Sequence, residues 1–219
     1  RLYASNSLIK ILKKNTNLSV APRVIKNQIL RESSYYKNTL EIIASLQHLI
    51  NKDLDNKEGL ELCEARVNLI PELEILLDNN LKCIFNLLSF VYNEEDIKMT
   101  YVGIQSEIKD AKINSLEFLD NILQRKIKTM ILPIIEHYVV DDKNYKSSVI
   151  NLNIIRERKL LQRIVRMGNL KLKILVIKYV EVSNNKNLIG VLLPLSKFKN
   201  IEVKELATKT YHLFISNNN

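Results

Sequence analysis

The chain has 219 residues, of which 46% are hydrophobic and 26% charged, with a formal net charge of +9. These proportions are those of a folded globular chain, so they exclude an intrinsically disordered tail. The length suits one sizeable core or one stacked array of helices rather than two clear domains. Only four Gly and four Pro residues occur, which favours long helices over a sheet with many tight turns.

In chain order, apolar residues recur at spacings of three and four, which is the pattern of amphipathic helices. The pattern predicts helices over residues 2–14, 20–50, 59–70, 72–92, 94–105, 109–123, 125–138, 153–167, 170–182, 186–197 and 201–215. The polar residues 51–58 predict a linker between the second and third helices. The chain is therefore predicted to be all-α, with ten or eleven helices.

Several helix ends carry local signals. Asn93 precedes three acidic residues, which suit the positive first turn of a helix. Gly168-Asn169 is predicted to end one helix and cap the next. Pro71 fits the first turn of a helix, whereas Pro133 and Pro194 fall inside apolar segments and should kink their helices or mark misplaced starts.

The beginning of the chain and its cysteines suggest a context. Arg1 is followed directly by an expected helix and no secretory signal is visible, so we expect a fragment of a longer chain. Residues 172–182 are among the most apolar, but Lys178 and Glu181 interrupt them, so no segment is expected to cross a membrane. For Cys63 and Cys83, structural thiols in a reducing compartment are favoured over a disulfide.

Three segments, residues 110–116, 169–175 and 200–206, align without gaps. Each begins with Asp or Asn as an expected cap, has an aliphatic residue three positions later, and has Leu six positions later. The starts lie 59 and 31 residues apart, so the first interval is about twice the second. A period near 30 residues with two helices per unit is typical of a helical solenoid. Positions shared by chance between amphipathic helices are the alternative interpretation.

Two of these segments, Asn169-Leu-Lys-Leu-Lys and Asn200-Ile-Glu-Val-Lys, resemble the opening of the second helix of a HEAT repeat. The resemblance implies a right-handed α-α superhelix of the HEAT/armadillo kind, with residues 1–219 as a single helical-repeat domain. Within it we expect irregular long helices over residues 1–92 and regular repeats over residues 93–219.

The sequence contains no recognisable catalytic or metal-binding motif. Its glycines are isolated, so no phosphate-binding loop is present. His48, His137 and His212 are far apart and have no metal-ligand spacing. Glu136-His137 and Asp141-Asp142 could be assembled into an acid–base pair, but solvated loops explain them more simply. We therefore expect no catalytic residue, metal, cofactor or small-molecule substrate, and not an enzyme.

Positive charge is concentrated in the second half of the sequence. Residues 1–100 hold 13 basic and 13 acidic side chains, whereas residues 101–219 hold 20 basic and 11 acidic ones. On one helix, four cations from residues 156–166 would share an arc of about 80°, and Ile154, Leu161 and Val165 would lie on the other side. With two cations of the next helix, they form a predicted basic interaction surface: Arg156, Lys159, Arg163, Arg166, Lys171 and Lys173.

Such a surface suits another protein, an anionic membrane or nucleic acid, and a simple solvated face is the alternative interpretation. Nucleic acid is the less favoured partner, because the chain has no Trp and its nine Tyr residues are not interleaved with the cations. The leading hypothesis is a non-catalytic protein-interaction scaffold. The runner-up is a basic HEAT-like nucleic-acid-binding protein, a class that includes glycosylases of alkylated bases.

Three stretches, residues 91–97, 113–123 and 131–136, resemble a HEAT-like region of certain bacterial proteins. In those proteins the region follows a membrane part similar to ADP/ATP-translocase (NTT-type) nucleotide transporters and other major-facilitator carriers. The resemblance covers roughly residues 72–215 and carries over no transporter site residue. It implies a soluble domain on the cytoplasmic side, tethered to a membrane by a part of the protein that this chain does not contain.

Overall fold

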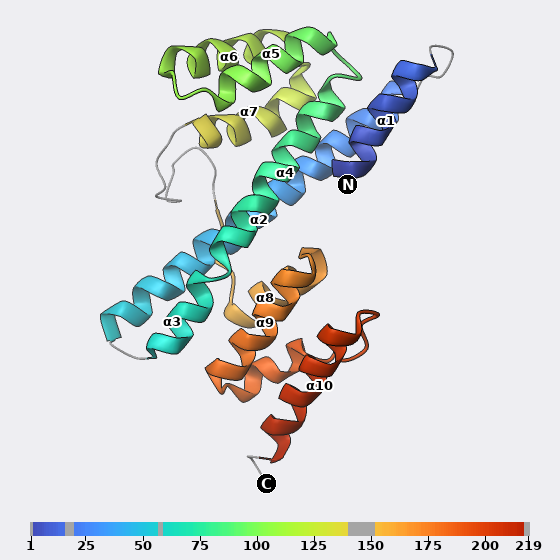
Figure 1. Ribbon diagram of the computed structural model, residues 1–219. Coiled ribbons are helices and arrows are strands. Elements are labelled where there is room, and N and C mark those ends of the chain that lie inside the picture. The colour runs from blue at the N-terminus through green and yellow to red at the C-terminus, as the bar shows by residue number, and fades with distance from the viewer. Residues whose placement is uncertain (1, 16–19, 57–58, 140–151, 217–219) are drawn as a thin grey trace. The chain divides into compact units, whose positions relative to one another are not determined.

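A computed structural model describes residues 2–15, 20–56, 59–139 and 152–216 (Figure 1). Within these residues the chain forms ten α-helices and one 3₁₀ helix and has no strand, which confirms the all-α prediction. In chain order they are α1 (Leu2–Lys14), α2 (Pro22–Asn56), α3 (Leu60–Val67), α4 (Ile70–Leu88), α5 (Glu94–Gln105), α6 (Lys109–Ile122), α7 (Arg125–Val139), α8 (Glu157–Met167), α9 (Leu170–Ser183), η1 (Lys186–Val191) and α10 (Ile201–Ser216).

The helices gather into two units, and each unit consists of two separate stretches of chain. Unit 1 contains Arg1–Leu40 and Leu76–Leu152, and unit 2 contains Glu41–Ile75 and Asn153–Asn219. Helices α2 and α4 contribute to both units, because the boundaries fall inside them. These boundaries do not coincide with the expected change from irregular to regular helices at residues 92–93.

Unit 1 contains three helices in close contact. Helices α5 and α6 pack against each other, and α7 packs against both of them (Figure 1). Asn93 caps α5 as predicted, because its side-chain oxygen accepts hydrogen bonds from the amides of Glu95 at 2.9 Å and Asp96 at 3.1 Å. This cap satisfies two of the amides that a helix start leaves unpaired.

In unit 2, α9 packs against α3, α8 and α10. Two of the three repeat segments occupy equivalent positions at helix starts. The Asn169 side chain accepts from the amide of Leu172 at 2.9 Å, and Asn200 accepts from the amide of Val203 at 3.1 Å. Both aliphatic residues are fully buried. These two segments therefore share the cap and the core position that the repeat predicted.

The third segment of the predicted repeat differs from the other two. Helix α6 begins at Lys109, so Asp110 lies in its first turn and is not the cap. Ile113, the aliphatic residue three positions later, is 40% exposed. The predicted capping role of Asp110 is therefore wrong, and this segment shares sequence positions with the others without sharing their packing.

Three predicted helix boundaries are also wrong. Helix α2 continues to Asn56, so the expected linker is helical over residues 51–56. The expected α-helix over residues 186–197 is the short 3₁₀ helix η1 followed by turns that include Pro194, which cannot donate a helical hydrogen bond. Helix α8 begins at Glu157 rather than at residue 153, because the Ile155 amide donates to Ser45 Oγ of α2 at 2.9 Å.

Pro71 and Pro133 lie where the sequence placed them, in the first turn of α4 and inside α7. None of the helices in the described residues is both long and apolar enough to span a membrane.

The connection between α8 and α9 leaves no space for a side chain at Gly168. A Cβ atom there would lie 2.7 Å from the carbonyl oxygen of Ile164 and 2.8 Å from the Cβ of Leu172. At Gly190, by contrast, the close neighbour is the guanidinium end of Arg158, at 2.9 Å, which is flexible enough to move. The first glycine is therefore required by packing, and the second is not.

We expect Gly168→Ala to lower the free energy of unfolding by roughly 1–3 kcal/mol, because backbone and core atoms must shift to admit the methyl group. The matched control Gly190→Ala should change it by less than about 0.5 kcal/mol. Urea unfolding followed by circular dichroism measures both. Equal effects of the two substitutions would contradict this account of the α8–α9 connection.

Candidate interaction surface

The six residues of the predicted basic surface fall into two groups. Three of them form polar contacts inside unit 2, and the other three are exposed and form none with the described residues. The engaged residues are Arg163, Lys171 and Lys173. The exposed residues, here called the exposed basic face, are Arg156, Lys159 and Arg166.

Arg163 forms an ion pair with a buried carboxylate of α2. Its Nη1 donates to Glu41 Oε2 at 2.9 Å, and the Glu41 side chain is only 7% exposed. The other carboxylate oxygen accepts from Asn153 Nδ2 at 3.1 Å. Glu41 therefore has a partner for each oxygen, as a buried carboxylate requires. Arg163 contributes its charge to this pair, so it serves the packing of α8 on α2.

Lys171 and Lys173 occupy the first turn of α9 but differ in exposure. Lys171 Nζ donates to Glu72 Oε1 of α4 at 2.6 Å, while the Lys171 side chain stays 69% exposed. This pair is therefore worth little, on the order of 0–1 kcal/mol.

Lys173 is buried, so its predicted place on an exposed surface is wrong. Its Nζ donates to the carbonyl oxygen of Gly168 and lies 5.2 Å from the centre of the Phe198 ring. Burial lowers the pKa of Lys173. The physical reason for the position is that α8 ends at this point, and its terminal carbonyl groups need donors.

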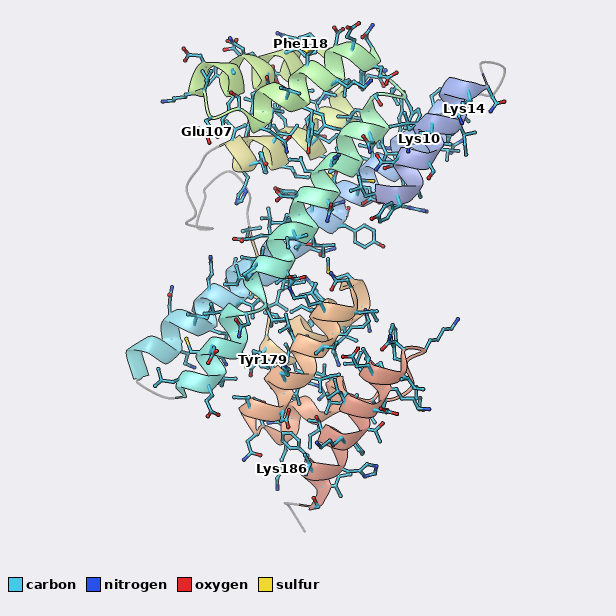
Figure 2. All side chains as sticks on the ribbon, viewed as in Figure 1. Lys10, Lys14, Glu107, Phe118, Tyr179 and Lys186 are labelled. Carbon is cyan, nitrogen blue, oxygen red and sulfur yellow. The ribbon has the colours of Figure 1, made fainter. Side chains whose placement is uncertain are left out.

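A further ion pair, which contains a buried arginine and which sequence reasoning missed, joins α3, α8 and α9. Arg66 of α3 donates from Nε to the Tyr179 hydroxyl at 2.8 Å and from Nη2 to Glu157 Oε1 at 2.8 Å. The Tyr179 hydroxyl also donates to Glu157 Oε1. The guanidinium carbon lies 5.6 Å from the centre of the Tyr179 ring. Figure 2 shows Tyr179 on the side of α9 toward α3.

Arg66, Tyr179 and Glu157 are here called the triad. Burial controls the charge state of its members. Arg66 is 4% exposed and Tyr179 is fully buried. Burial raises the pKa of Tyr179 well above its usual range, and the hydrogen bond to Glu157 acts in the same direction. For Arg66, burial lowers the pKa, but the hydrogen bonds to Tyr179 and Glu157 outweigh it and hold the pKa above its usual value. The triad therefore keeps a neutral tyrosine beside a charged arginine–glutamate pair.

The sequence contains one indication of this triad. Glu157 is the only acidic residue among ten basic ones over residues 143–178. The signal did not identify Arg66, which lies 91 residues away in the sequence.

The three ion pairs described above all connect residues 41–75 with residues 153–219. By sequence the first stretch holds eight acidic and three basic residues, and the second holds thirteen basic and four acidic ones. Unit 2 as a whole therefore has sixteen basic and twelve acidic residues, and unit 1 has seventeen and twelve. The excess of basic residues in the second half of the sequence lies in residues 153–219, and the acidic residues of 41–75 offset about half of it within unit 2.

The exposed basic face begins at the N-cap of α8. Arg156 is the N-cap residue and not part of the helix, so its predicted place inside the helix is wrong. Lys159 and Arg166 lie seven residues apart on the same side of α8. Nearby, Ile154 is 57% exposed, so its expected place on the apolar side of this helix is wrong. In the part of the chain that the structure describes, no hydrogen bond or ion pair engages the three cations.

Other candidate chemistry receives little support from the described residues. Cys63 and Cys83, the two cysteines of the chain, are not joined by a disulfide. Among residues 2–15, 20–56, 59–139 and 152–216, no cluster of three His, Cys, Asp or Glu side chains could hold a metal ion. Asp141-Asp142 lies outside the described residues.

Comparison with known proteins adds no assignment: no family model matches the chain, and neither a curated protein nor a solved structure matches it. The resemblances to HEAT repeats and to a transporter-associated region therefore stay predictions.

We expect Arg66→Met to lower the free energy of unfolding by about 2–4 kcal/mol, because it leaves Glu157 and the Tyr179 hydroxyl without their cation. The further change Glu157→Gln should recover part of the loss by removing the unpaired charge. Lys178→Met, which removes an exposed cation of α9, is the control and should change it by less than about 0.5 kcal/mol. Chemical denaturation measures all three, and similar losses in Arg66→Met and Lys178→Met would contradict a structural triad.

Proposed function

We propose that the chain is a non-catalytic, HEAT-like interaction module that binds an anionic surface through the exposed basic face of α8. The surface belongs to an acidic protein or to a membrane. The observation that carries the proposal is the division of the cations. Arg163 forms an ion pair with a buried carboxylate, whereas Arg156, Lys159 and Arg166 form no ion pair with any residue that the structure describes. The solenoid form of the proposal is supported by the equivalent caps of Asn169 and Asn200.

The position of Arg156 supports a role outside the fold. It caps α8, where the positive end of the helix dipole disfavours a cation, and its side chain makes no capping hydrogen bond. An anionic surface placed against this helix end would offset both the unfavourable charge–dipole interaction and the missing capping hydrogen bond. Three cations near an anionic membrane contribute roughly 1 kcal/mol each, so their combined effect is on the order of 100-fold in binding.

Nucleic acid is less well supported as the anionic partner. Single-stranded nucleic acid is bound through exposed aromatic rings interleaved with cations. In unit 2, however, Tyr179 and Phe214 are buried and Phe198 and Tyr211 are only partly exposed, and none of the four lies on α8. The resemblance to a transporter-associated domain on the cytoplasmic side favours a membrane, so anionic vesicles are the first probe.

We expect the chain to co-sediment with vesicles that contain phosphatidylserine but not with purely zwitterionic vesicles. Arg156→Glu/Lys159→Glu/Arg166→Glu should abolish this binding while thermal unfolding shows that the chain stays folded, since no described residue forms a hydrogen bond or ion pair with the three cationic side chains. Binding by the unmodified chain should also weaken as salt is raised, because added ions screen exposed charges.

The matched control is Lys178→Glu/Lys186→Glu/Lys209→Glu, which reverses three exposed cations elsewhere in unit 2 and gives the same net charge. This variant should keep most of the binding. Equal losses in the two variants would show that net charge alone acts. Binding of short duplex DNA, but not of vesicles or of an acidic polypeptide, would replace the proposal with the nucleic-acid alternative.

A further inference from the structure

Unit 1 contains an open groove along the solvent-facing side of α7. Its volume is about 640 Å³, and the end of α6 forms its second wall, with Asp120 and Leu123. The opposite side of α7 packs into the core through Ile127, Ile131 and Ile135. The groove thus runs along an exposed face of α7. Its lining residues on α7 are Arg125, Lys128, Thr129, Leu132, Pro133 and Glu136.

Pro133 leaves a hydrogen-bond acceptor on this face. Proline has no amide N–H, so the carbonyl oxygen of Thr129 lacks the helical donor that any other residue at position 133 would provide. Thr129 is exposed and Pro133 is half-buried. The groove therefore combines the apolar side chains of Leu132 and Pro133 with a helical turn that lacks one backbone hydrogen bond.

The charges on α7 oppose its own helix dipole. Arg125 is the first residue of the helix, where a cation is unfavourable, and Glu136 lies in its last turn, where an anion is unfavourable. No hydrogen bond or ion pair within the described parts of the chain engages either side chain. Lys128, also in the groove, is paired with Asp120 at 2.6 Å. Both end charges are therefore free to pair with an external group, and neither is explained by the stability of α7.

The groove residues of α7 are arranged symmetrically about the midpoint between Met130 and Ile131. In an antiparallel pair of identical helices centred there, residue 125 faces residue 136, residue 128 faces residue 133, and residue 129 faces residue 132. All six of these residues line the groove. The charge at one end is thus matched by the opposite charge at the other, as a two-fold symmetric interface requires.

We propose that this groove is the interface with a second copy of the chain, in which α7 packs antiparallel to α7 of the other copy. Arg125 of each copy pairs with Glu136 of the other, at both ends of the interface. Leu132 and Pro133 pack at the centre, and Lys128 of the second copy lies opposite Pro133. Because the helices are antiparallel, each basic N-terminus lies beside a negative C-terminus, which removes the unfavourable charge–dipole terms.

Charge reversal tests the proposed geometry directly. In Arg125→Glu both end contacts become Glu–Glu, and in Glu136→Arg both become Arg–Arg. We expect each variant alone to associate at least about tenfold more weakly than the unmodified chain in sedimentation equilibrium. An equimolar mixture of the two should form a heterodimer of restored affinity, because both end contacts are again Arg–Glu.

Two controls keep the outcome clear. Both substitutions improve the match between charge and dipole in α7, so thermal unfolding should show that each variant stays folded. Lys126→Glu reverses an exposed cation of the same helix that does not line the groove, and it should leave association unchanged. A monomeric unmodified chain at the highest concentration tested would overturn the proposal. Undiminished association of either single variant, or a mixture that fails to associate, would also overturn it.

Discussion

Buried charges on α2 and α3 determine how the two stretches of unit 2 meet. Glu41 and Arg66 are 6% and 4% exposed, and each takes its ionic partner from residues 153–219. Removing one member of such a pair leaves an uncompensated buried charge, at a cost of several kcal/mol. Hydrophobic packing alone tolerates small shifts of one helix on another, whereas these pairs do not. Together with the hydrogen bond from the Ile155 amide to Ser45, they fix the position of α8 on α2.

The same constraint separates structural cations from cations available for binding. A stretch with eight acidic residues meets a stretch with thirteen basic ones, so part of the apparent basic patch is neutralised within the fold. Arg163 contributes to this neutralisation, and Lys173 donates a hydrogen bond to a backbone carbonyl at the end of α8. Among the described residues, Arg156, Lys159 and Arg166 form no comparable contact. The proposed binding face is therefore smaller than the sequence suggested. The proposed self-association through α7 involves other residues, all in unit 1, so each proposal can fail without the other.

The helical character of the chain and most helix starts were predictable, because periodicity and caps such as Asn93 and Asn169 are local. The misplaced start of α8, by contrast, depended on a partner distant in sequence. Residues 39–46 of α2 are all buried, including Glu41 and Ser45, which lie one turn apart and bind residues 153–163. A sequence pattern assigns such polar residues to solvent, since it does not show which segment covers them. For the same reason the pattern placed Arg163 and Lys173 on a surface and gave no reason to connect Arg66 with Glu157.

Charge pairing between residues 41–75 and residues 153–219 thus organises unit 2. A double-mutant cycle on Glu41 and Arg163 tests it most directly, with Glu41→Gln, Arg163→Met and the double variant compared by urea unfolding. Since Arg163 is 30% exposed, we expect a coupling energy of about 1–2 kcal/mol rather than the full value of a buried pair. A coupling energy near zero, with additive losses from the two substitutions, would contradict the claim and return Arg163 to the group of cations available for binding.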